Sequence, residues 1–492
     1  MLRPQPRAAS ITHAFVSACP GRPLRTATIP RLLVALLLAS TVIHAADPSP
    51  FEPQWQHLKS TLSNEDLYRV MWALPKGGDI HNHHEYSVPM SFWLDRAARH
   101  AYSTRAKIGN CGESEPLQWL TLRQDSVRKL PACQQRDFTP VSSLTQPQRQ
   151  AWLSALTLDQ NESKDEFFER IVRRLGELER DPQLMGDSLV LAQKQLQAEN
   201  GIYLETQFDT RGFAGLTEDQ GTASIRQRLA TPESVNTKVA VRMQVSTLRF
   251  RSDAEDDLKD GFAFVHRNRD LWVGVNLVGR EDNPDGRPTR FASLLRDLRR
   301  KYPDVHLSLH AGESSEADTH VADTLAMGAE RIGHGTNAFR DPNAMRLLRG
   351  GRHLIEVSLT SNLVLGYVPD LSRHPFPKYL RQGIPVCLNT DDRGVMNSNL
   401  TDEYFAAVSL FDLSWAEVVQ IGRWSLEYSF AEAPLKRELM ARYAGNVAAF
   451  EKAYSAADWR RSLSQVKPRP SGLTQRILKL RTSPASRASA GR

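Results

Sequence analysis

The chain has 492 residues, of which 40% are hydrophobic, so it is long enough to bury a large core in one big domain or in two. The formal net charge is +7, but the basic excess lies at the two ends. Residues 1–45 hold five Arg and no acid, and residues 467–492 hold five Arg, two Lys and no acid. The stretch between them is mildly acidic, which excludes the continuous basic surface that a nucleic-acid partner requires.

The N-terminal segment has the pattern of a secretion signal. Three arginines, the last of them Arg31, precede an unbroken run of small and apolar residues, 32–43, with a small residue, Ala45, soon after it. The run is shorter than the about 20 residues that a membrane-spanning helix needs, and a buried N-terminal helix is the less favoured alternative. We expect residues 1–45 to be a cleaved signal peptide, leaving an exported protein, periplasmic or extracellular, with no stable membrane anchor.

From residue 46 on, short apolar runs alternate with longer amphipathic segments, a pattern typical of parallel strands joined by helices. The eight predicted strands are 78–81, 202–208, 239–246, 271–278, 305–310, 331–334, 354–358 and 385–389. Apolar spacing predicts helices over 166–200, 291–301 and 321–328. Together they predict an α/β fold, the (β/α)8 TIM barrel. An open doubly wound sheet is the alternative, but no GxGxxG loop follows any strand.

The pattern also predicts how the chain is divided. Residues 46–103 should form an N-terminal helical segment and the first strand, and residues 161–466 the remainder of the barrel. Residues 104–160, rich in Gln, Ser, Thr and Pro, are predicted to be an insertion. The basic tail, residues 467–492, is predicted to be disordered because it is rich in Pro, Ser and Arg.

Two cysteines, Cys111 and Cys133, lie close together within the predicted insertion. An oxidising compartment permits disulfides, and a small segment without a core of its own benefits from a covalent constraint. We therefore expect Cys111 to pair with Cys133, with two free thiols as the alternative.

Residue types that bind metals follow three of the predicted strands, at the end of a barrel where active sites lie. His81 and His83 end the first strand and point the same way because strand side chains alternate, although a pair of surface histidines is the alternative for this motif alone. His310 ends the fifth strand and Asp391 follows the eighth. Three imidazoles and one carboxylate suit Zn²⁺ with an open position for water, so we predict one zinc ion per chain.

Other polar residues fall beside this predicted zinc site. Glu313 lies just beyond the fifth strand, and Asp392 adjoins Asp391, for which a solvated turn is the alternative. His334 ends the sixth strand between two glycines, and we interpret it as orienting the attacking water rather than as a structural histidine in a turn. Gly279, after the fourth strand, either offers its backbone to a ring nitrogen or is a turn residue.

Four motifs follow one another along the chain: HxH at 81–83, HAGE at 310–313, GHG at 333–335 and NTDD at 389–392. Together they resemble the adenosine deaminase family over most of residues 66–460, and the segment SLEYSF resembles that family's C-terminal helix signature. Export, the insertion and the cysteine pair resemble the secreted branch of the family, the adenosine deaminase-related growth factors. The resemblance implies a hydrolase that converts a small-molecule purine nucleoside, adenosine or 2′-deoxyadenosine, to the inosine product and ammonia, and it implies a homodimer.

The resemblance also implies a role for each motif residue. The implied zinc ligands are His81, His83, His310 and Asp391. Glu313 would shuttle a proton to the purine ring, His334 would orient the hydroxide, and Asp392 and Gly279 would bind ring nitrogens. This chemistry is consistent with zinc lowering the pKa of water to about 7 and with attack at C6 of adenine in other zinc deaminases.

One segment departs from the family pattern. The family follows its HxH motif with an Asp or Ser and a Gly that meets the ribose, whereas this chain continues His-Glu-Tyr-Ser. Glu85 or Ser87 is the expected replacement for that ribose contact. The sugar half of the substrate is therefore less defined by the sequence than the ring chemistry.

Three alternatives stay open at this point. A deaminase of adenine or of an N6-substituted purine nucleoside would use the same ring chemistry. A two-metal amidohydrolase would need a carboxylated lysine at the end of a central strand, and none lies near Phe208, Ser246 or Val278. A growth-factor-like extracellular protein could bind a receptor through its insertion, but the intact metal and proton-transfer residues favour catalysis.

Overall fold

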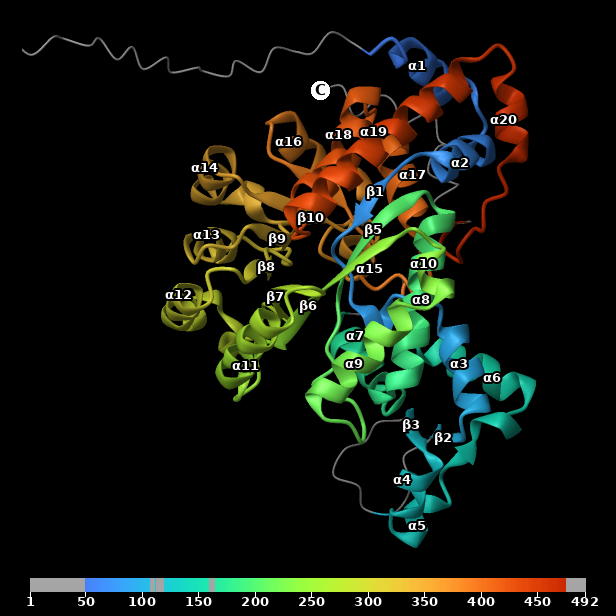
Figure 1. Ribbon diagram of the computed structural model, residues 1–492, viewed down its shortest axis with the longest axis vertical. Coiled ribbons are helices and arrows are strands. Elements are labelled where there is room, and N and C mark those ends of the chain that lie inside the picture. Colours follow the sequence, from blue (N-terminus) through green and yellow to red (C-terminus); the bar gives the residue numbers. More distant parts are fainter. Residues whose placement is uncertain (1–48, 107–110, 112–118, 159–163, 475–492) are drawn as a thin grey trace, which may run out of the picture. The chain divides into compact units, whose positions relative to one another are not determined.

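Eight parallel strands form the centre of the chain in the computed structural model, which describes residues 49–106, 111, 119–158 and 164–474 (Figure 1). They follow one another around the sheet in the order of the sequence. The strands are β1 (Gly77–Asp79), β5 (Gly201–Gln207), β6 (Ala240–Leu248), β7 (Trp272–Val278), β8 (His306–Ala311), β9 (Arg331–His334), β10 (Leu354–Val357) and β11 (Val386–Leu388). Each matches a predicted strand, and the (β/α)8 barrel is confirmed. The predicted signal peptide lies outside the described residues.

The first and last strands meet at their carboxyl ends and close the barrel there. Asn82 and Asp391 form an isolated parallel bridge. The backbone N–H of Asp391 donates to the carbonyl of His81 (3.1 Å), and the N–H of Ile80 donates to Asn389 Oδ1 (3.0 Å). Two motifs more than 300 residues apart in the sequence, HxH and NTDD, are thereby placed side by side.

The strands pair in parallel, with register shifts at Gly77/Gly78 in β1 and at Met243/Gln244 in β6, and helices surround them. Tyr203 pairs with Ala240 between β5 and β6, and Ile332 pairs with Ile355 between β9 and β10. Helices that follow the strands are α8 (Pro182–Ala198), α9 (Glu218–Leu229), α11 (Ala254–Arg267), α12 (Ala292–Lys301), α13 (His320–Ala326), α14 (Pro342–Gly350), α15 (Leu359–Val364), α16 (Phe376–Arg381) and α17 (Leu400–Phe411). Their buried faces and the strands share one continuous hydrophobic core.

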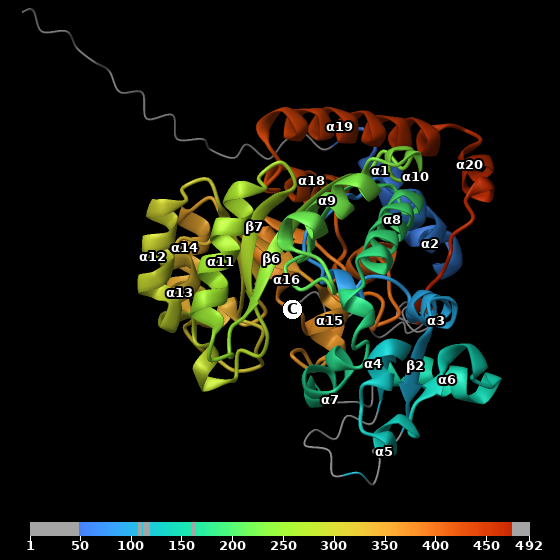
Figure 2. The ribbon, with the colours of Figure 1, turned by 60° about the horizontal axis from the view of Figure 1, so that its bottom comes forward.

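Further helices flank the barrel near the two ends of the described chain. They are α1 (Glu52–Thr61), α2 (Asn64–Ala73), α18 (Trp415–Glu427), α19 (Ala433–Ser455) and α20 (Trp459–Gln465), and Figure 2 shows α19 lying along α18. The short α10 (Pro232–Val235) instead lies between α9 and β6 in the chain. Trp55 of α1 packs against Trp415 of α18, with ring centroids 5.3 Å apart. None of the helices in the described ranges is both long and apolar enough to cross a membrane.

The single long helix predicted over 166–200 is wrong. The chain instead forms α7 (Lys164–Glu169), two short 3-10 helices, η3 (Ile171–Arg173) and η4 (Leu178–Arg180), and then α8. Proline at position 182 cannot continue a helix from the preceding turn, and Asp181 caps α8 by accepting the N–H groups of residues 183 and 184 (3.0 and 3.2 Å). The broken segment 164–180 is consequently free to line the cavity described below.

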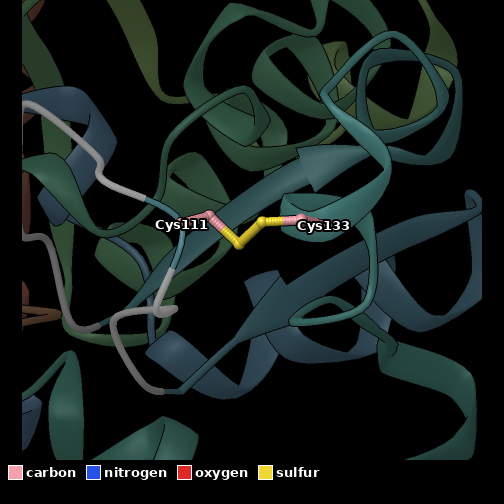
Figure 3. Close-up of a disulfide and its surroundings, with 2 residues drawn as sticks. All are labelled: Cys111 and Cys133. Atoms are coloured by element: carbon pink, nitrogen blue, oxygen red, sulfur yellow. A yellow bond between two sulfur atoms is a disulfide. The ribbon is translucent and has the colours of Figure 1, made fainter.

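The predicted insertion is folded and is attached to the main core. After α3 (Met90–Arg99) it forms an antiparallel sheet, β2 (Tyr102–Arg105), β3 (Leu120–Arg123) and β4 (Thr139–Pro140), with short helices α4 (Gln124–Arg128), α5 (Ala132–Gln135) and α6 (Gln146–Ala155). Cys111 and Cys133 form a disulfide with Cα atoms 6.2 Å apart (Figure 3). Trp152 is 1% exposed and belongs to the barrel's core cluster, so the described part of the segment packs on the main core.

The start of the basic tail also differs from the prediction of disorder. The Ser471 and Thr474 hydroxyls donate to the carboxylate of Asp402 in α17 (2.6 and 3.0 Å). Leu473 between them is buried. Residues 471–474 therefore pack against the barrel, because they supply donors for a buried acid, and residues 475–492 lie outside the described part of the chain.

Candidate active site

The four predicted zinc ligands converge at the carboxyl end of the barrel. Donor atoms of His81, His83, His310 and Asp391 all lie within 4.8 Å of one another. Asp391 Oδ1 is 3.3 Å from His83 Nε2 and 3.6 Å from His81 Nε2. Ligand atoms bound about 2.0–2.2 Å from a tetrahedral zinc ion lie roughly 3.3–3.6 Å apart, so these two separations are those of neighbouring ligands of one ion.

Buried ligand atoms without hydrogen-bond partners also indicate that the cluster could hold a cation. Within the described residues, the buried atoms His81 Nε2 and Asp391 Oδ1 have no hydrogen-bond partner. Leaving such atoms unpaired costs free energy, which coordination to an ion would offset. Burial lowers the pKa of His81, but the neighbouring carboxylates of Asp391 and Glu356 raise it to about 10. The site thus attracts positive charge strongly, and its residues fit a divalent ion such as zinc.

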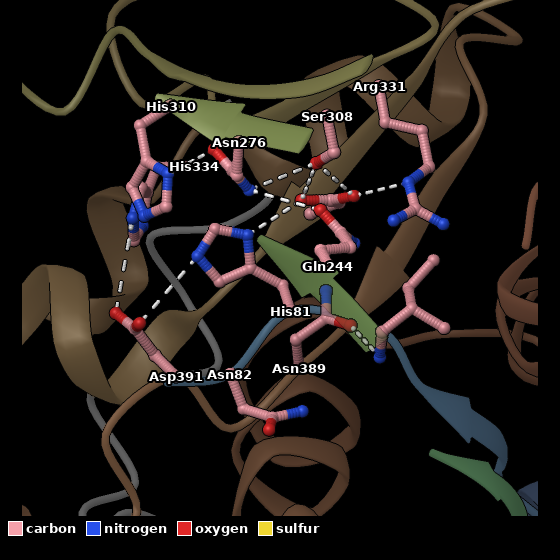
Figure 4. Close-up of polar contacts among 12 residues, drawn as sticks. His81, Asn82, Gln244, Asn276, Ser308, His310, Arg331, His334, Asn389 and Asp391 are labelled. Carbon is pink, nitrogen blue, oxygen red and sulfur yellow. Dashed lines mark hydrogen bonds and ion pairs between the residues drawn. The ribbon is translucent and has the colours of Figure 1, made fainter. Parts of the chain in front are cut away.

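Residues inside the strands hold the other nitrogens of two imidazoles (Figure 4). His81 Nδ1 lies 2.6 Å from Glu356 Oε2, whose carboxylate also pairs with Arg331 at 2.5 Å, and His310 Nδ1 lies 2.9 Å from Asn276 Oδ1. Such contacts fix the ring orientation and leave Nε2 free for the ion. Sequence reasoning missed Glu356 and Asn276, although a polar residue within an apolar strand is a signal that could have found them.

Backbone conformation helps to aim these side chains. His334 and Asp391 have positive φ angles of 64° and 52°, a region that costs energy for residues other than glycine and that is common at functional sites. A Cβ atom at Gly333 would lie 2.7 Å from His81 Cε1, so the GHG motif leaves room for the imidazole. Gly279 has a φ of 95°, and a Cβ there would meet the Phe250 ring at 2.7 Å.

Glu313 lies beside the cluster and is able to hold a proton. Its Oε1 atom is 3.6 Å from His334 Nε2. Burial raises the pKa of Glu313 well above its usual range, and the charges of Asp391 and Glu281 raise it further. The backbone N–H groups of Glu313 and Gly312 donate to the Glu281 carboxylate (3.0 and 2.9 Å), which fixes this loop. Glu281 is another residue that the sequence analysis missed.

The adjacent acids Asp391 and Asp392 have pKa values shifted in opposite directions. Burial opposes ionisation of Asp391, but the imidazoles of His81 and His83 hold its pKa well below the usual range. Burial and the charge of Asp391 raise the pKa of Asp392 well above its usual range. Asp392 Oδ1 has no hydrogen-bond partner within the described residues. In its protonated form the Asp392 carboxyl can donate a hydrogen bond to a ligand.

The cluster opens into a cavity of about 1350 Å³, larger than the roughly 300–1,000 Å³ typical of small-molecule sites. Predicted site residues on its wall are His83, Gly279, His310, Glu313, His334, Asp391 and Asp392. The segment 164–180 supplies much of the remaining wall, including Phe167, Phe168, Arg173, Glu179 and Arg180. The structure thus brings the predicted ring-binding residues together on one wall and adds a second wall that sequence reasoning missed.

The two residues predicted to contact the ribose lie outside this wall. The Ser87 hydroxyl is used within its own turn, donating to the His83 carbonyl (2.6 Å), and Glu85 is not among the described residues that line the cavity. Tyr86 and Glu179 are on the wall instead. The Tyr86 hydroxyl donates to the Val172 carbonyl (2.7 Å) and lies 3.5 Å from Glu179 Oε2. Burial, followed by the charge of Glu85, raises the pKa of Glu179 to about 8.

Comparison with known proteins identifies the family. Residues 188–445 match the family model described as adenosine deaminase. The chain belongs to the adenosine deaminase family. It is 28% identical to an adenosine deaminase of Streptococcus mutans over 269 residues, 54% of this chain and 72% of that protein. It is 26% identical to an aminodeoxyfutalosine deaminase of Streptomyces coelicolor over 412 residues, 82% of this chain and 92% of that protein.

Solved structures share the fold of this adenosine deaminase family member. The Arabidopsis N6-mAMP deaminase has a TM-score of 0.59 at 22% identity, covering 76% of this chain and 99% of that one. A Burkholderia ambifaria amidohydrolase with bound Zn has a TM-score of 0.60 at 16% identity, covering 80% of this chain and 96% of that one. The protein is therefore a hydrolytic deaminase of a metal-dependent family, and its substrate is a small molecule, adenosine or a related purine.

Proposed function

We propose that this protein is a zinc-dependent aminohydrolase that converts adenosine or 2′-deoxyadenosine to inosine or 2′-deoxyinosine with release of ammonia. The observation that carries this proposal is the convergence of His81, His83, His310 and Asp391 beside Glu313 on one cavity wall. Zinc, when bound there, lowers the pKa of a coordinated water to about 7 and so supplies a nucleophile at neutral pH.

The surrounding residues bind and protonate the purine. Glu313, with its raised pKa, carries a proton to the ring nitrogen next to C6. His334 Nε2 lies 3.6 Å from Glu313 and 3.9 Å from Asp391, where it can orient the attacking oxygen. The neutral Asp392 carboxyl donates to a second ring nitrogen, and the backbone of Gly279 reaches a third. Three contacts around the ring place C6 beside the attacking oxygen.

For the sugar we propose Glu179, in place of Glu85 or Ser87. Its carboxylate lies on the cavity wall, and its only hydrogen-bond partner within the described residues, the Tyr86 hydroxyl, is 3.5 Å away and donates to Val172 at a shorter distance. Ribose hydroxyls are donors that would satisfy it.

A second candidate substrate is a purine with a larger or acidic substituent. The cavity exceeds the usual size of a small-molecule site, and the basic side chains of Arg173 and Arg180 lie on its wall. Two of the relatives above are named for such substrates, an aminodeoxyfutalosine deaminase and an N6-mAMP deaminase. Adenine is a third possibility, since the chain is also 30% identical over 251 residues to an adenine deaminase of Chelativorans sp., 51% of this chain and 75% of that protein.

A substrate panel followed at the ultraviolet absorbance change on 6-deamination tests the proposal. It should include adenosine, 2′-deoxyadenosine, adenine, N6-methyladenosine and AMP, with zinc content measured on the same sample. The highest kcat/KM is expected for the two nucleosides, with one zinc per chain. Turnover of adenine or AMP with none of adenosine would overturn the nucleoside assignment.

We also propose that the protein is exported to the periplasm or beyond, belongs to the growth-factor-related secreted branch and forms a homodimer. The apolar run at 32–43 and the Cys111–Cys133 disulfide support export. N-terminal sequencing of the protein from the extracytoplasmic fraction should find a start near residue 46, and light scattering should give twice the chain mass. Glu313→Ala separates catalysis from any receptor binding, because only catalysis should be lost.

A further inference from the structure

A buried chain of hydrogen bonds connects a backbone amide to His334. The N–H of Phe376 donates to His374 Nδ1 (3.1 Å). His374 Nε2 lies 3.0 Å from Asn362 Oδ1, and Asn362 Nδ2 lies 3.1 Å from His334 Nδ1. All three side chains are at most 2% exposed, so water does not compete for these contacts. Asn362 belongs to α15, and His374 lies two residues before the start of α16.

The direction of each bond in this chain follows from the first one. A backbone N–H can only donate, so His374 Nδ1 must be the nitrogen without a hydrogen. His374 Nε2 then carries the hydrogen and donates to Asn362 Oδ1. Burial lowers the pKa of His374 to about 3, which keeps this ring neutral. The amide of Asn362 must in turn donate from Nδ2 to His334 Nδ1.

A flipped Asn362 amide would break this order. Its Oδ1 atom also accepts the hydroxyl of Thr336 (3.1 Å), so two donors already point at that position. Placing the NH2 group there would oppose it to the N–H of His374. The Asn362 backbone is held as well, because its carbonyl accepts the N–H groups of residues 367 and 368 (2.9 and 3.1 Å).

We propose that Asn362 and His374 are positioning residues that fix His334 as the tautomer with hydrogen on Nε2. In this form His334 donates a hydrogen bond toward the attacking oxygen and cannot take its proton through Nε2. Glu313, whose carboxylate faces His334 Nε2 at 3.6 Å, is then the group that accepts the proton. The catalytic part of this inference rests on the proposed deaminase function, whereas the tautomer follows from the hydrogen bonds alone.

Nitrogen NMR of the intact protein labelled with ¹⁵N at histidine tests the tautomer directly. The resonances of His334 are assigned by their loss in His334→Gln. In the zinc-loaded native protein we expect Nε2 to carry the hydrogen and Nδ1 to have the shift of an unprotonated nitrogen. A hydrogen on Nδ1 of His334 would overturn the proposal. Apart from the His334→Gln protein used for assignment, this test needs no variant of the relay that His374, Asn362 and His334 form.

Asn362→Asp reverses the hydrogen bond between residue 362 and His334 Nδ1 and leaves the shape of the side chain nearly unchanged. A carboxylate accepts from both neighbours, so His334 should shift its hydrogen to Nδ1 while the contact with His374 survives. We expect kcat to fall by about 10²-fold or more, as when a donor to a developing oxyanion is removed, with zinc content unchanged. An Asn362→Asp protein with the native tautomer and native kcat would contradict the proposal.

Two further variants should change the tautomer of His334 and kcat less than Asn362→Asp does. Thr336→Val removes the second donor to Asn362 Oδ1 without reversing any bond, and the native tautomer should persist. His374→Phe removes the N–H that donates to Asn362 Oδ1. His334 should then populate both tautomers, and kcat should fall by about tenfold. A native tautomer in His374→Phe would exclude His374 from the relay.

The two proposals fail in different ways. A protein with the expected tautomer that deaminates no purine would refute the proposed function and leave the relay intact. An active deaminase with hydrogen on His334 Nδ1 would refute the relay and leave the function intact.

Discussion

The cavity has two walls with different origins. The metal-side wall consists of residues at the carboxyl ends of barrel strands, such as His83, His310 and Asp391. The opposite wall consists of the segment 164–180, a short helix and two 3-10 turns between the insertion and α8. The first wall has the residues for deamination. The second wall has groups suited to bind the sugar or another substituent that the purine carries. Under the proposed function, the barrel supplies the chemistry, and a segment outside its strands supplies the contacts that select the substrate.

Removing the proton carrier of the metal-side wall should have the largest effect. In Glu313→Gln we expect kcat to fall by about 10²–10⁴-fold, since an amide cannot transfer the proton, with zinc content unchanged. Steady-state kinetics with adenosine and metal analysis measure both. Glu316→Gln, three residues further along and exposed, is the matched control and should keep native kcat. Near-native turnover in Glu313→Gln would remove Glu313 from the reaction.

The next largest effect is expected for Glu356, a buried residue that supports His81 in the metal-side wall. Glu356→Gln weakens the hydrogen bond to His81 Nδ1 and removes a charge next to Arg331, so zinc affinity should fall by about 10–100-fold. Competition with a chelator measures the affinity. Glu432→Gln, an exposed acid paired with Arg242, is the control. Equal zinc affinity in Glu356→Gln and the native protein would show that Glu356 does not support the site.

The position of active-site residues at the carboxyl ends of barrel strands explains how much of the site could be predicted from the sequence alone. His81, His310 and Asp391 could be found because each follows an apolar strand, and the carboxyl ends of barrel strands meet at one face. Glu356 and Asn276 stand out as polar residues in apolar strands, but their partners could not be assigned. Glu356 of β10 contacts His81 although β11 lies between β10 and β1, and only the folded barrel shows such a contact. The stretch 166–200 was predicted as one helix because its apolar spacing is helical, but Pro182, the Asp181 cap and tertiary contacts interrupt it.

A smaller effect is expected on the opposite wall. Above pH 8 we expect KM for adenosine to rise by about tenfold in Glu179→Gln, with kcat little changed, because a neutral amide is a weaker acceptor for ribose hydroxyls than the carboxylate is. The pKa of Glu179 is about 8, so its carboxylate forms as pH rises. KM for adenosine should therefore fall as pH rises through about 8 in the native protein and stay level in Glu179→Gln.

Adenine, which has no sugar, is the control substrate for this wall. If it is turned over, its KM should be the same in the native protein and in Glu179→Gln. An equal change for adenosine and adenine would mean that Glu179 acts on the ring or the fold rather than on the sugar.

The smallest effect on activity is expected in the insertion, beyond both walls. Cys133→Ser opens a disulfide between residues 22 positions apart, which should lower the free energy of unfolding of this segment by about 3 kcal/mol. Thermal unfolding and limited proteolysis should detect the change, and kcat for adenosine should stay native because neither cysteine lines the cavity. A large loss of kcat in this variant would place the insertion in the catalytic region.

Anomalous diffraction at the zinc edge from crystals of the purified protein tests the central claim most directly. We expect a single strong peak from one zinc ion, which is bound by His81 Nε2, His83 Nε2, one His310 nitrogen and Asp391. A peak elsewhere, or no metal among these four residues in a sample that deaminates adenosine, would contradict the account.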